Sequence, residues 1–171
     1  MRGPPSFAIL VLAALGLASG CGPTFDGTVY RGQGFAFRVP ERPAGWRPIG
    51  AEGTALAFRD VEGGATIAVN GRCGKDAEDV PLGALTQHLF IQFTDRQASL
   101  EEVVPFDGRE ALHTVMTAKL DGVPKKFDVW VLKKDGCVYD LYLIAAPDRF
   151  EASASEFRKF VGGFATVPGD G

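Results

Sequence analysis

The side chains best suited to chemistry in this chain are its three cysteines and two histidines. His88 stands between Leu85 and Leu89 in an apolar stretch, and His113 lies far from it in the sequence. A metal site needs several such ligands with a recognisable spacing, and a catalytic histidine needs a nucleophile or an acid beside it. The spacing of these residues in the sequence supports neither arrangement, so we predict no metal site, no catalytic residue and no cofactor.

Cys21 closes an apolar leader at the start of the chain. Arg2 supplies positive charge, residues 7–17 are apolar and residues 18–20 are small. This order is typical of a secretory signal peptide. An uncleaved anchor helix is the alternative, but a hydrocarbon core needs about 20 apolar residues and this run is shorter. We therefore predict that residues 1–20 are a signal peptide.

Residues 17–21, Leu-Ala-Ser-Gly-Cys, resemble the lipobox of bacterial lipoproteins. The resemblance implies that Cys21 carries acyl chains such as palmitate and becomes the mature amino terminus. Each buried methylene contributes about 0.8 kcal/mol, so a multiply acylated cysteine stays on its membrane. Gly22, in place of an aspartate, implies an outer-membrane location facing the periplasm. An ordinary secreted cysteine at this position is the alternative.

The other two cysteines, Cys73 and Cys137, are expected to form a disulfide, because thiols tend to pair in an oxidising compartment. The alternative is a pair of buried free cysteines that act as small apolar residues. Pairing leaves neither thiol free to serve as a nucleophile beside a histidine.

The length and net charge of the chain limit the possible functions and the number of domains. A chain of 171 residues with a net charge of −3 and no basic block is not expected to bind nucleic acid. Residues 21–34 are rich in glycine and short polar residues, which favours a lipidated amino terminus and tether. Residues 35–167 are then long enough for a single domain with its own core.

Several stretches of the first half have recognisable periods. Residues 35–39 alternate as a strand does, and residues 55–60 and 65–69 flank a glycine turn as a hairpin, with Asn70-Gly71 as its exit turn. Apolar residues recur every three or four positions over residues 82–94, which predicts a helix.

The second half predicts a meander followed by a helix. Residues 110–120, 126–133 and 137–145 are rich in apolar and aromatic residues, and the joints between them hold Asp121-Gly122 and Asp135-Gly136, a strong hairpin signal. Residues 150–164 return to the helical period. Because the strands are apolar on both faces, we predict an α+β domain: a mostly antiparallel sheet with helices on both faces, an α/β/α sandwich.

This order of elements resembles the PsbP-like fold. The closest local likenesses are Phe37-Arg38-Val39-Pro40 before Gly45-Trp46, and the stretch from Tyr139 to Phe164. The resemblance covers most of residues 28–164. It implies a non-enzymatic assembly or docking subunit of a larger complex. The two paired cysteines are not part of that general pattern.

The charged residues offer no spacing that requires acid-base chemistry. An acidic stretch is expected to form a solvated face; it comprises Glu101, Glu102, Asp107 and Glu110. Two lysine pairs are expected to keep turns soluble and to protect a sheet edge; they are Lys125 with Lys126 and Lys133 with Lys134. The two tryptophans, Trp46 and Trp130, are expected in the core.

These observations favour a lipid-anchored envelope protein that is not an enzyme and acts as an interaction or assembly module for an unidentified protein partner. The alternative is a carrier of a small apolar ligand, with Phe90, Trp130, Tyr139 and Tyr142 lining its pocket. A hydrolase or other enzyme would need a polar cluster that the sequence does not reveal.

Overall fold

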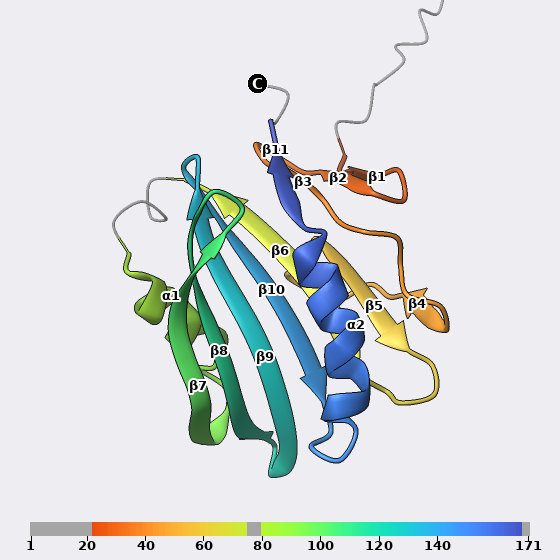
Figure 1. Ribbon diagram of the computed structural model, residues 1–171, viewed down its shortest axis with the longest axis vertical. Coiled ribbons are helices and arrows are strands. Elements are labelled where there is room, and N and C mark those ends of the chain that lie inside the picture. The colour runs from red at the N-terminus through yellow and green to blue at the C-terminus, as the bar shows by residue number, and fades with distance from the viewer. Residues whose placement is uncertain (1–21, 75–79, 169–171) are drawn as a thin grey trace, which may run out of the picture.

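The computed structural model describes residues 22–74 and 80–168. A seven-stranded and a four-stranded antiparallel sheet lie side by side, with two helices (Figure 1). The large sheet has the order β4-β5-β6-β10-β9-β8-β7, with bounds β4 Trp46–Pro48, β5 Leu56–Asp60, β6 Thr66–Cys73, β7 Thr94–Phe106, β8 Arg109–Leu120, β9 Val123–Lys134 and β10 Cys137–Ala145. The small sheet has the order β1-β2-β3-β11, with bounds β1 Thr24–Phe25, β2 Val29–Arg31, β3 Ala36–Arg38 and β11 Ala165–Val167.

Three two-residue turns of identical chemistry fold strands β7 to β10 into a meander. Asp107-Gly108, Asp121-Gly122 and Asp135-Gly136 all have positive φ at both positions, the requirement of a type I′ turn. The last two turns confirm the prediction. The first turn, Asp107-Gly108, was not predicted, because Asp107 was assigned to a solvated acidic stretch. Strand β7, which precedes this turn, was not predicted either.

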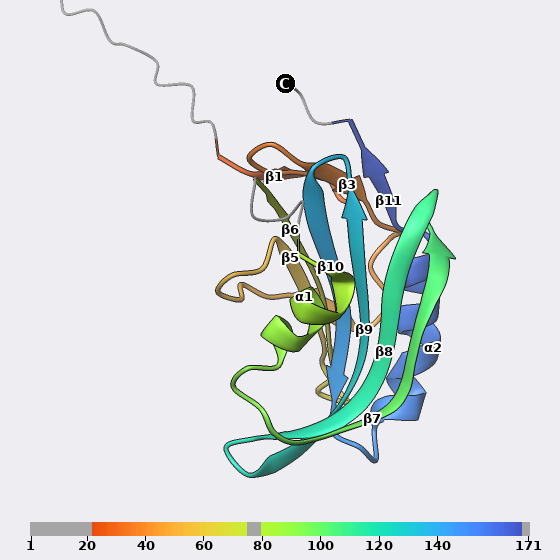
Figure 2. The same ribbon diagram turned by 90° about the vertical axis from the view of Figure 1, so that its left-hand side faces the viewer.

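The two helices pack against different faces of the large sheet. Helix α1 (Leu82–Leu89) contacts β8 and β9, and helix α2 (Phe150–Gly162) contacts β9 and β10. Figure 2 shows them on opposite sides of the sheet. The mostly antiparallel α+β class is confirmed. A complete helix layer on each face is not, because α1 is only 8 residues long and ends before the predicted position 94.

The core is divided by the sheet. Under α2 lies the larger cluster, which contains the fully buried Phe37, Phe157 and Phe160 and also Trp46 at 6% exposure. Under α1 lies a smaller cluster around Phe90 and Phe127, whose rings meet edge to face at 5.1 Å. Successive residues of a strand point to opposite faces. Strands β9 and β10 are apolar on both faces and therefore contribute side chains to both clusters.

Two stretches differ from the prediction. Residues 21–34 are predicted as a tether, but β1 and β2 form within them, because Tyr30 stacks on Phe37 at 5.1 Å and joins the core. Asn70-Gly71 is predicted as a turn, but both residues lie inside β6. A Cβ on Gly71 would lie 2.4 Å from the ring of Phe35, so this glycine makes room for an aromatic side chain rather than for a turn.

The Cys73–Cys137 disulfide is present and joins β6 to β10 at directly paired positions, with a Cα–Cα distance of 4.0 Å. Cys21 lies outside the described residues, as do the residues of the predicted signal peptide. Within the described part of the chain, no helix has the length and apolar character needed to cross a bilayer.

Candidate functional site

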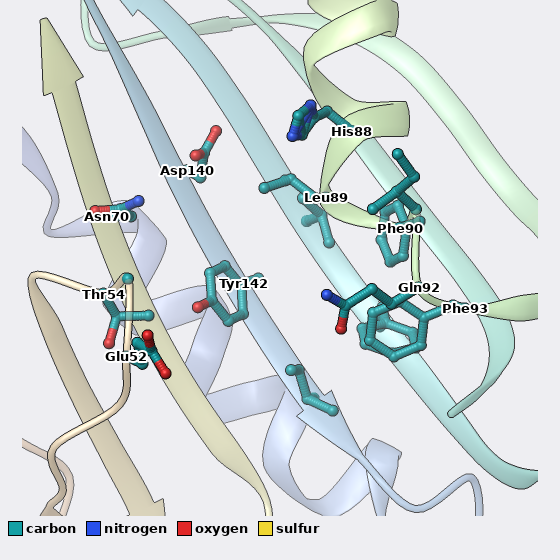
Figure 3. A pocket seen from close by; sticks show the side chains of 15 residues that line it. Glu52, Thr54, Asn70, His88, Leu89, Phe90, Gln92, Phe93, Asp140 and Tyr142 are labelled. Carbon is teal, nitrogen blue, oxygen red and sulfur yellow. The ribbon is translucent and has the colours of Figure 1, made fainter. Parts of the chain in front are cut away.

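A pocket opens beside α1 on its face of the large sheet (Figure 3). Its volume is about 460 Å³. Its wall comes from four places in the chain: the loop before β5, strand β6, the end of α1 with the loop after it, and strands β9 and β10. Its lining includes Glu52, Asn70, His88, Phe90, Asp140 and Tyr142.

The local sequence explains the hollow. Helix α1 buries Leu85 and Thr86 against the sheet and ends at Leu89, after which residues 90–93 turn away with backbone bonds such as Phe93 N–H to the Phe90 carbonyl at 3.0 Å. A helix this short covers β8 and β9 but does not extend over β6 and β10. The side chains that β6 and β10 present on this face therefore form the pocket floor.

Asp140 is the most unusual residue of the floor. It is 0% exposed, and burial raises its pKa above the usual range, although the charges of Arg72 and His88 and the hydrogen bond from Arg72 oppose this. The guanidinium of Arg72 donates from Nη1 to Oδ2 of Asp140. Oδ1 has no hydrogen-bond donor among the described residues. An unpaired buried acceptor costs free energy, so this atom stands out in the core.

Polar neighbours surround Asp140 on this face. Asn70 is its directly paired residue on β6, and His88 stands opposite on α1 (Figure 3). The Asn70 side-chain oxygen accepts the Gly71 N–H at 2.9 Å, so it is oriented by its own strand. Two residues along β10, burial and the nearby Asp140 charge raise the pKa of Tyr142 to about 12, so its phenol stays neutral.

A second hollow adjoins the first and shares Asn70, His88 and Asp140 with it. It adds Arg72 and Leu85 to the wall and has a volume of about 620 Å³. Arg72, whose side chain is 40% exposed, faces this second hollow and does not line the first. Asp140 therefore lines both hollows, whereas Arg72 lines only the second.

The structure separates the four aromatic residues predicted for a carrier pocket. Phe90 and Tyr142 line the pocket beside α1. Trp130 and Tyr139 belong to the cluster under α2. Tyr139 and Tyr142 are three positions apart on one strand, an odd spacing, so they point to opposite faces.

The two histidines are also on opposite faces. His113 Nε2 lies 2.9 Å from Asp128 Oδ1, and its ring stacks on Trp130 at 4.2 Å, on the α2 side. Burial lowers the pKa of His113, but hydrogen bonds and charges from Asp128 and Glu102 outweigh this and raise it above the usual value. Within the described residues, no group of three or more histidine, cysteine or acidic side chains is placed to bind a metal.

Glu101, Glu102 and Glu110 are exposed, as the predicted solvated face requires, but Asp107 and the lysines of β9 are partly buried. Asp107 accepts hydrogen bonds on Oδ2 from Lys134 Nζ at 2.9 Å and from the Thr166 hydroxyl at 2.7 Å, which fastens β11 to the β7–β8 turn. Lys126 donates to Glu151 at 3.0 Å and lies over the Phe150 ring. Strand β9 lies between β8 and β10, so its lysines protect no sheet edge.

Asp140 was missed by the sequence reasoning. The available signal was an acidic residue inside the run Tyr139-Asp140-Leu141-Tyr142-Leu143-Ile144, in a strand predicted to be covered on both faces. A charge at such a position must be buried and therefore needs partners. Its partner Arg72, far away in the sequence, could not be identified without the strand pairing.

Comparison with known proteins identifies the fold and nothing finer. No protein-family model matches the chain, and no curated protein matches it. Among solved structures, the cyanobacterial PsbP of Synechocystis matches with a TM-score of 0.58 and 17% identity, over 88% of this chain and 99% of that one. The fold is therefore PsbP-like, as the sequence resemblance predicts.

Two further solved structures share this fold. LpqN of Mycobacterium tuberculosis, described as involved in cell envelope biogenesis, matches with a TM-score of 0.56 and 14% identity, over 85% of this chain and 90% of that one. A Mog1 E65A mutant matches with a TM-score of 0.54 and 11% identity, over 85% of this chain and 94% of that one. At these identities the likeness concerns the fold alone.

Proposed function

We propose that this chain is a non-catalytic accessory protein of a bacterial envelope, lipid-anchored through Cys21, that acts by binding at the pocket beside α1. One observation carries the binding role: a fully buried carboxylate, Asp140, at the floor of an open pocket with one oxygen unpaired. Folding does not satisfy this acceptor from within the described chain. A group that binds in the pocket could satisfy it, and a binding role is one reason for a protein to retain such a cost.

The envelope location has three supports. The leader ends in residues 17–21 with the order of a lipobox. A protein of the same fold, LpqN, is described as involved in cell envelope biogenesis. The Cys73–Cys137 disulfide fits an oxidising compartment outside the cytoplasm. Gly22 after the cysteine favours the outer membrane, with the domain facing the periplasm.

Anchoring is tested by the intact mass of the protein in fractionated cells. Wild type is expected in the membrane fraction, to begin at residue 21, to carry acyl groups, and to gain the two thiol hydrogens on reduction. The Cys21→Ser variant is expected to lose the acyl mass while keeping the disulfide. An unmodified soluble wild-type protein would contradict the anchor. Separation of the inner and outer membranes on a density gradient tests the assignment to the outer membrane in the same cells.

A protein partner would be detected by cross-linking in intact cells, with a Glu52→Lys variant as the matched comparison. Glu52 is exposed on the loop at the pocket rim, so a charge reversal there changes the surface and not the core. A reproducible partner lost in Glu52→Lys would support docking at this pocket. A partner retained by that variant would place docking elsewhere on the molecule.

A carrier of a small apolar ligand is the second candidate, and one observation favours it. Phe90, Phe93, Phe127 and Tyr142 give the pocket aromatic walls. Native mass spectrometry of the purified protein is the test. A co-purifying lipid that is lost in a Tyr142→Ala variant would favour the carrier, and an empty wild-type protein would remove it.

A further inference from the structure

We infer that the pocket beside α1 binds a small organic cation, an ammonium or guanidinium attached to an aromatic or aliphatic body, whose N–H donates to Oδ1 of Asp140. The inference rests on the proposed function, since it names the class of ligand for the same pocket. Three features of the described residues support it: an unpaired acceptor, the sign of the charge on the lining, and the aromatic walls.

The acceptor selects a donor. Asp140 Oδ2 already accepts from Arg72, while Oδ1 accepts from no described residue. The Asn70 side-chain oxygen accepts the Gly71 N–H, and among the described residues no hydrogen bond joins the Asn70 amide nitrogen to Asp140 Oδ1. Hydrogen bonds from a charged donor to a carboxylate are about twice as strong as neutral ones, so a cation gains most from this atom.

The charge of the lining favours the same class. Glu52 and Asp140 both line the pocket, and among its described lining residues, none of which is lysine or arginine, only His88 can add a positive charge. Arg72, which pairs with Asp140, lines the adjoining hollow and not this pocket. An anionic ligand would therefore meet two carboxylates here, whereas a cation is attracted to both.

The walls fit an apolar body joined to the cationic group. Phe90, Phe93 and Phe127 form a group of edge-to-face rings with centroids 5.0–5.8 Å apart. In Figure 3, Tyr142 stands between Glu52 on one side and Phe90 and Phe93 on the other. Aromatic faces attract cations as well as apolar groups, so the polar floor and the aromatic wall select one kind of molecule.

The pocket has room for such a ligand but not for a large one. A volume of about 460 Å³ lies within the usual range for small-molecule sites. His88, exposed on α1, and Asn70 stand on either side of Asp140 at the floor (Figure 3). The ligand's cationic end enters between these two side chains, and its body stays against the rings.

The probe for the test is phenethylammonium, which joins a primary ammonium to one ring. It is titrated by NMR and calorimetry into the protein extracted from membranes in a neutral maltoside detergent. Two molecules of matched size are the comparisons: 3-phenylpropionate, which is an anion, and 2-phenylethanol, which is a neutral donor. The ammonium is expected to bind at least about tenfold more tightly than either, and to shift the amide signals of Asn70 and Tyr142.

Asp140→Asn is the decisive variant and Asp128→Asn is its matched control. Asp128 is a similarly buried acid on the neighbouring strand, but it faces the α2 side. Asp140→Asn is expected to weaken phenethylammonium binding at least about tenfold, and Asp128→Asn to leave it within about twofold. Should Asp140→Asn fail to fold, Glu52→Gln serves instead, because this exposed loop residue lies outside the core; it is expected to weaken binding about threefold.

Each contrary outcome overturns the inference in its own way. Equal binding of the alcohol would mean that positive charge is not selected. Tighter binding of the anion would identify Arg72 as the receptor. Unchanged binding in Asp140→Asn or Glu52→Gln, or no binding of any probe, would mean that Asp140 Oδ1 is satisfied by water or by its own proton. The titration works on soluble protein as well, so failure of the lipid anchor is a separate result.

Discussion

Two buried aspartates, Asp128 and Asp140, lie on neighbouring strands and face opposite sides of the same sheet, and the folded chain treats them differently. Asp128 Oδ1 accepts from both Trp130 Nε1 at 3.1 Å and His113 Nε2 at 2.9 Å. Within the described residues, Asp140 has one side-chain partner, Arg72, and its Oδ1 accepts no hydrogen bond. The comparison teaches that burial of a charge alone does not mark a site; burial without complete pairing, beside an open pocket, does.

The two faces of the sheet around these residues also differ in how completely they are packed and hydrogen-bonded. Under α2 the rings of Phe37, Tyr139 and Phe164 pack within 6.4 Å of one another, and the large cluster there is continuous. Under α1 the cluster is smaller, and the buried hydroxyls of Thr86 and Thr114 have no hydrogen-bond partner among the residues that the structure describes. The α2 face therefore stabilises the fold, and the α1 face carries the features of a binding site.

The largest expected effect comes from the covalent link between the strands that carry both faces. Replacing Cys73 and Cys137 together by alanine is expected to lower the free energy of unfolding by about 4 kcal/mol. This is the chain-entropy value for a disulfide between cysteines 64 residues apart. Urea denaturation measures it. Because cross-strand pairing of β6 and β10 remains, the folded variant should still bind phenethylammonium. Loss of binding by the folded variant would show that the disulfide positions the pocket floor.

Replacement of the two aspartates by apolar residues tests the comparison directly. Asp128→Ala is expected to lower the free energy of unfolding by about 3 kcal/mol, because the Trp130 and His113 donors lose their acceptor. Asp140→Leu is expected to change it by less than about 1 kcal/mol or to raise it, because a buried, incompletely paired carboxylate is removed and Arg72 can turn to water. Chemical denaturation of both variants decides. A larger loss in Asp140→Leu would reverse the roles assigned to the two faces.

An added methyl group should have opposite effects on the two faces. Gly71→Ala places a Cβ 2.4 Å from the Phe35 ring and is expected to cost about 2 kcal/mol through forced repacking. Gly83 in α1 has no atom within 4 Å of an added Cβ. Gly83→Ala is therefore expected to raise the free energy of unfolding by up to about 1 kcal/mol, through helix propensity. Thermal unfolding of the two variants measures the difference. A destabilising Gly83→Ala would mean that α1 is held more tightly than its open surroundings indicate.

The smallest expected effect is a pH dependence on the α2 face. Since the pKa of folded His113 is raised above 6.5, its protonation favours the folded state. The resulting stability is fully present below pH 6.5 and is lost as the pH rises through the pKa of the folded protein. NMR titration of the His113 ring should show the raised pKa in wild type and a lower one in Asp128→Asn. An unchanged pKa in that variant would assign the effect to Glu102 instead.

Local patterns were enough to predict much of the fold. Both Asp-Gly turns that were identified form as expected, because positive φ at two successive positions is a local requirement that these residues meet. The helical period over residues 150–164 predicted α2 well, since its apolar stripe reflects contact with a single large face. Strand β7 was missed because it is a sheet edge with almost no buried side chain, and an exposed strand carries little apolar alternation.

The sequence by itself determined the class of the fold, the meander with its turns, and a pairing of Cys73 with Cys137, because each depends on residue type and short spacing. Only the tertiary structure decided which side chains share a face and which meet across the sheet. Tyr139 and Tyr142 lie three positions apart on β10 and therefore point to opposite faces of the sheet. The register of β6 on β10 places Asp140 beside Arg72 and Asn70. Register is a long-range property set by the packing of both faces together, so the pocket and its unpaired carboxylate could be recognised only in the folded chain.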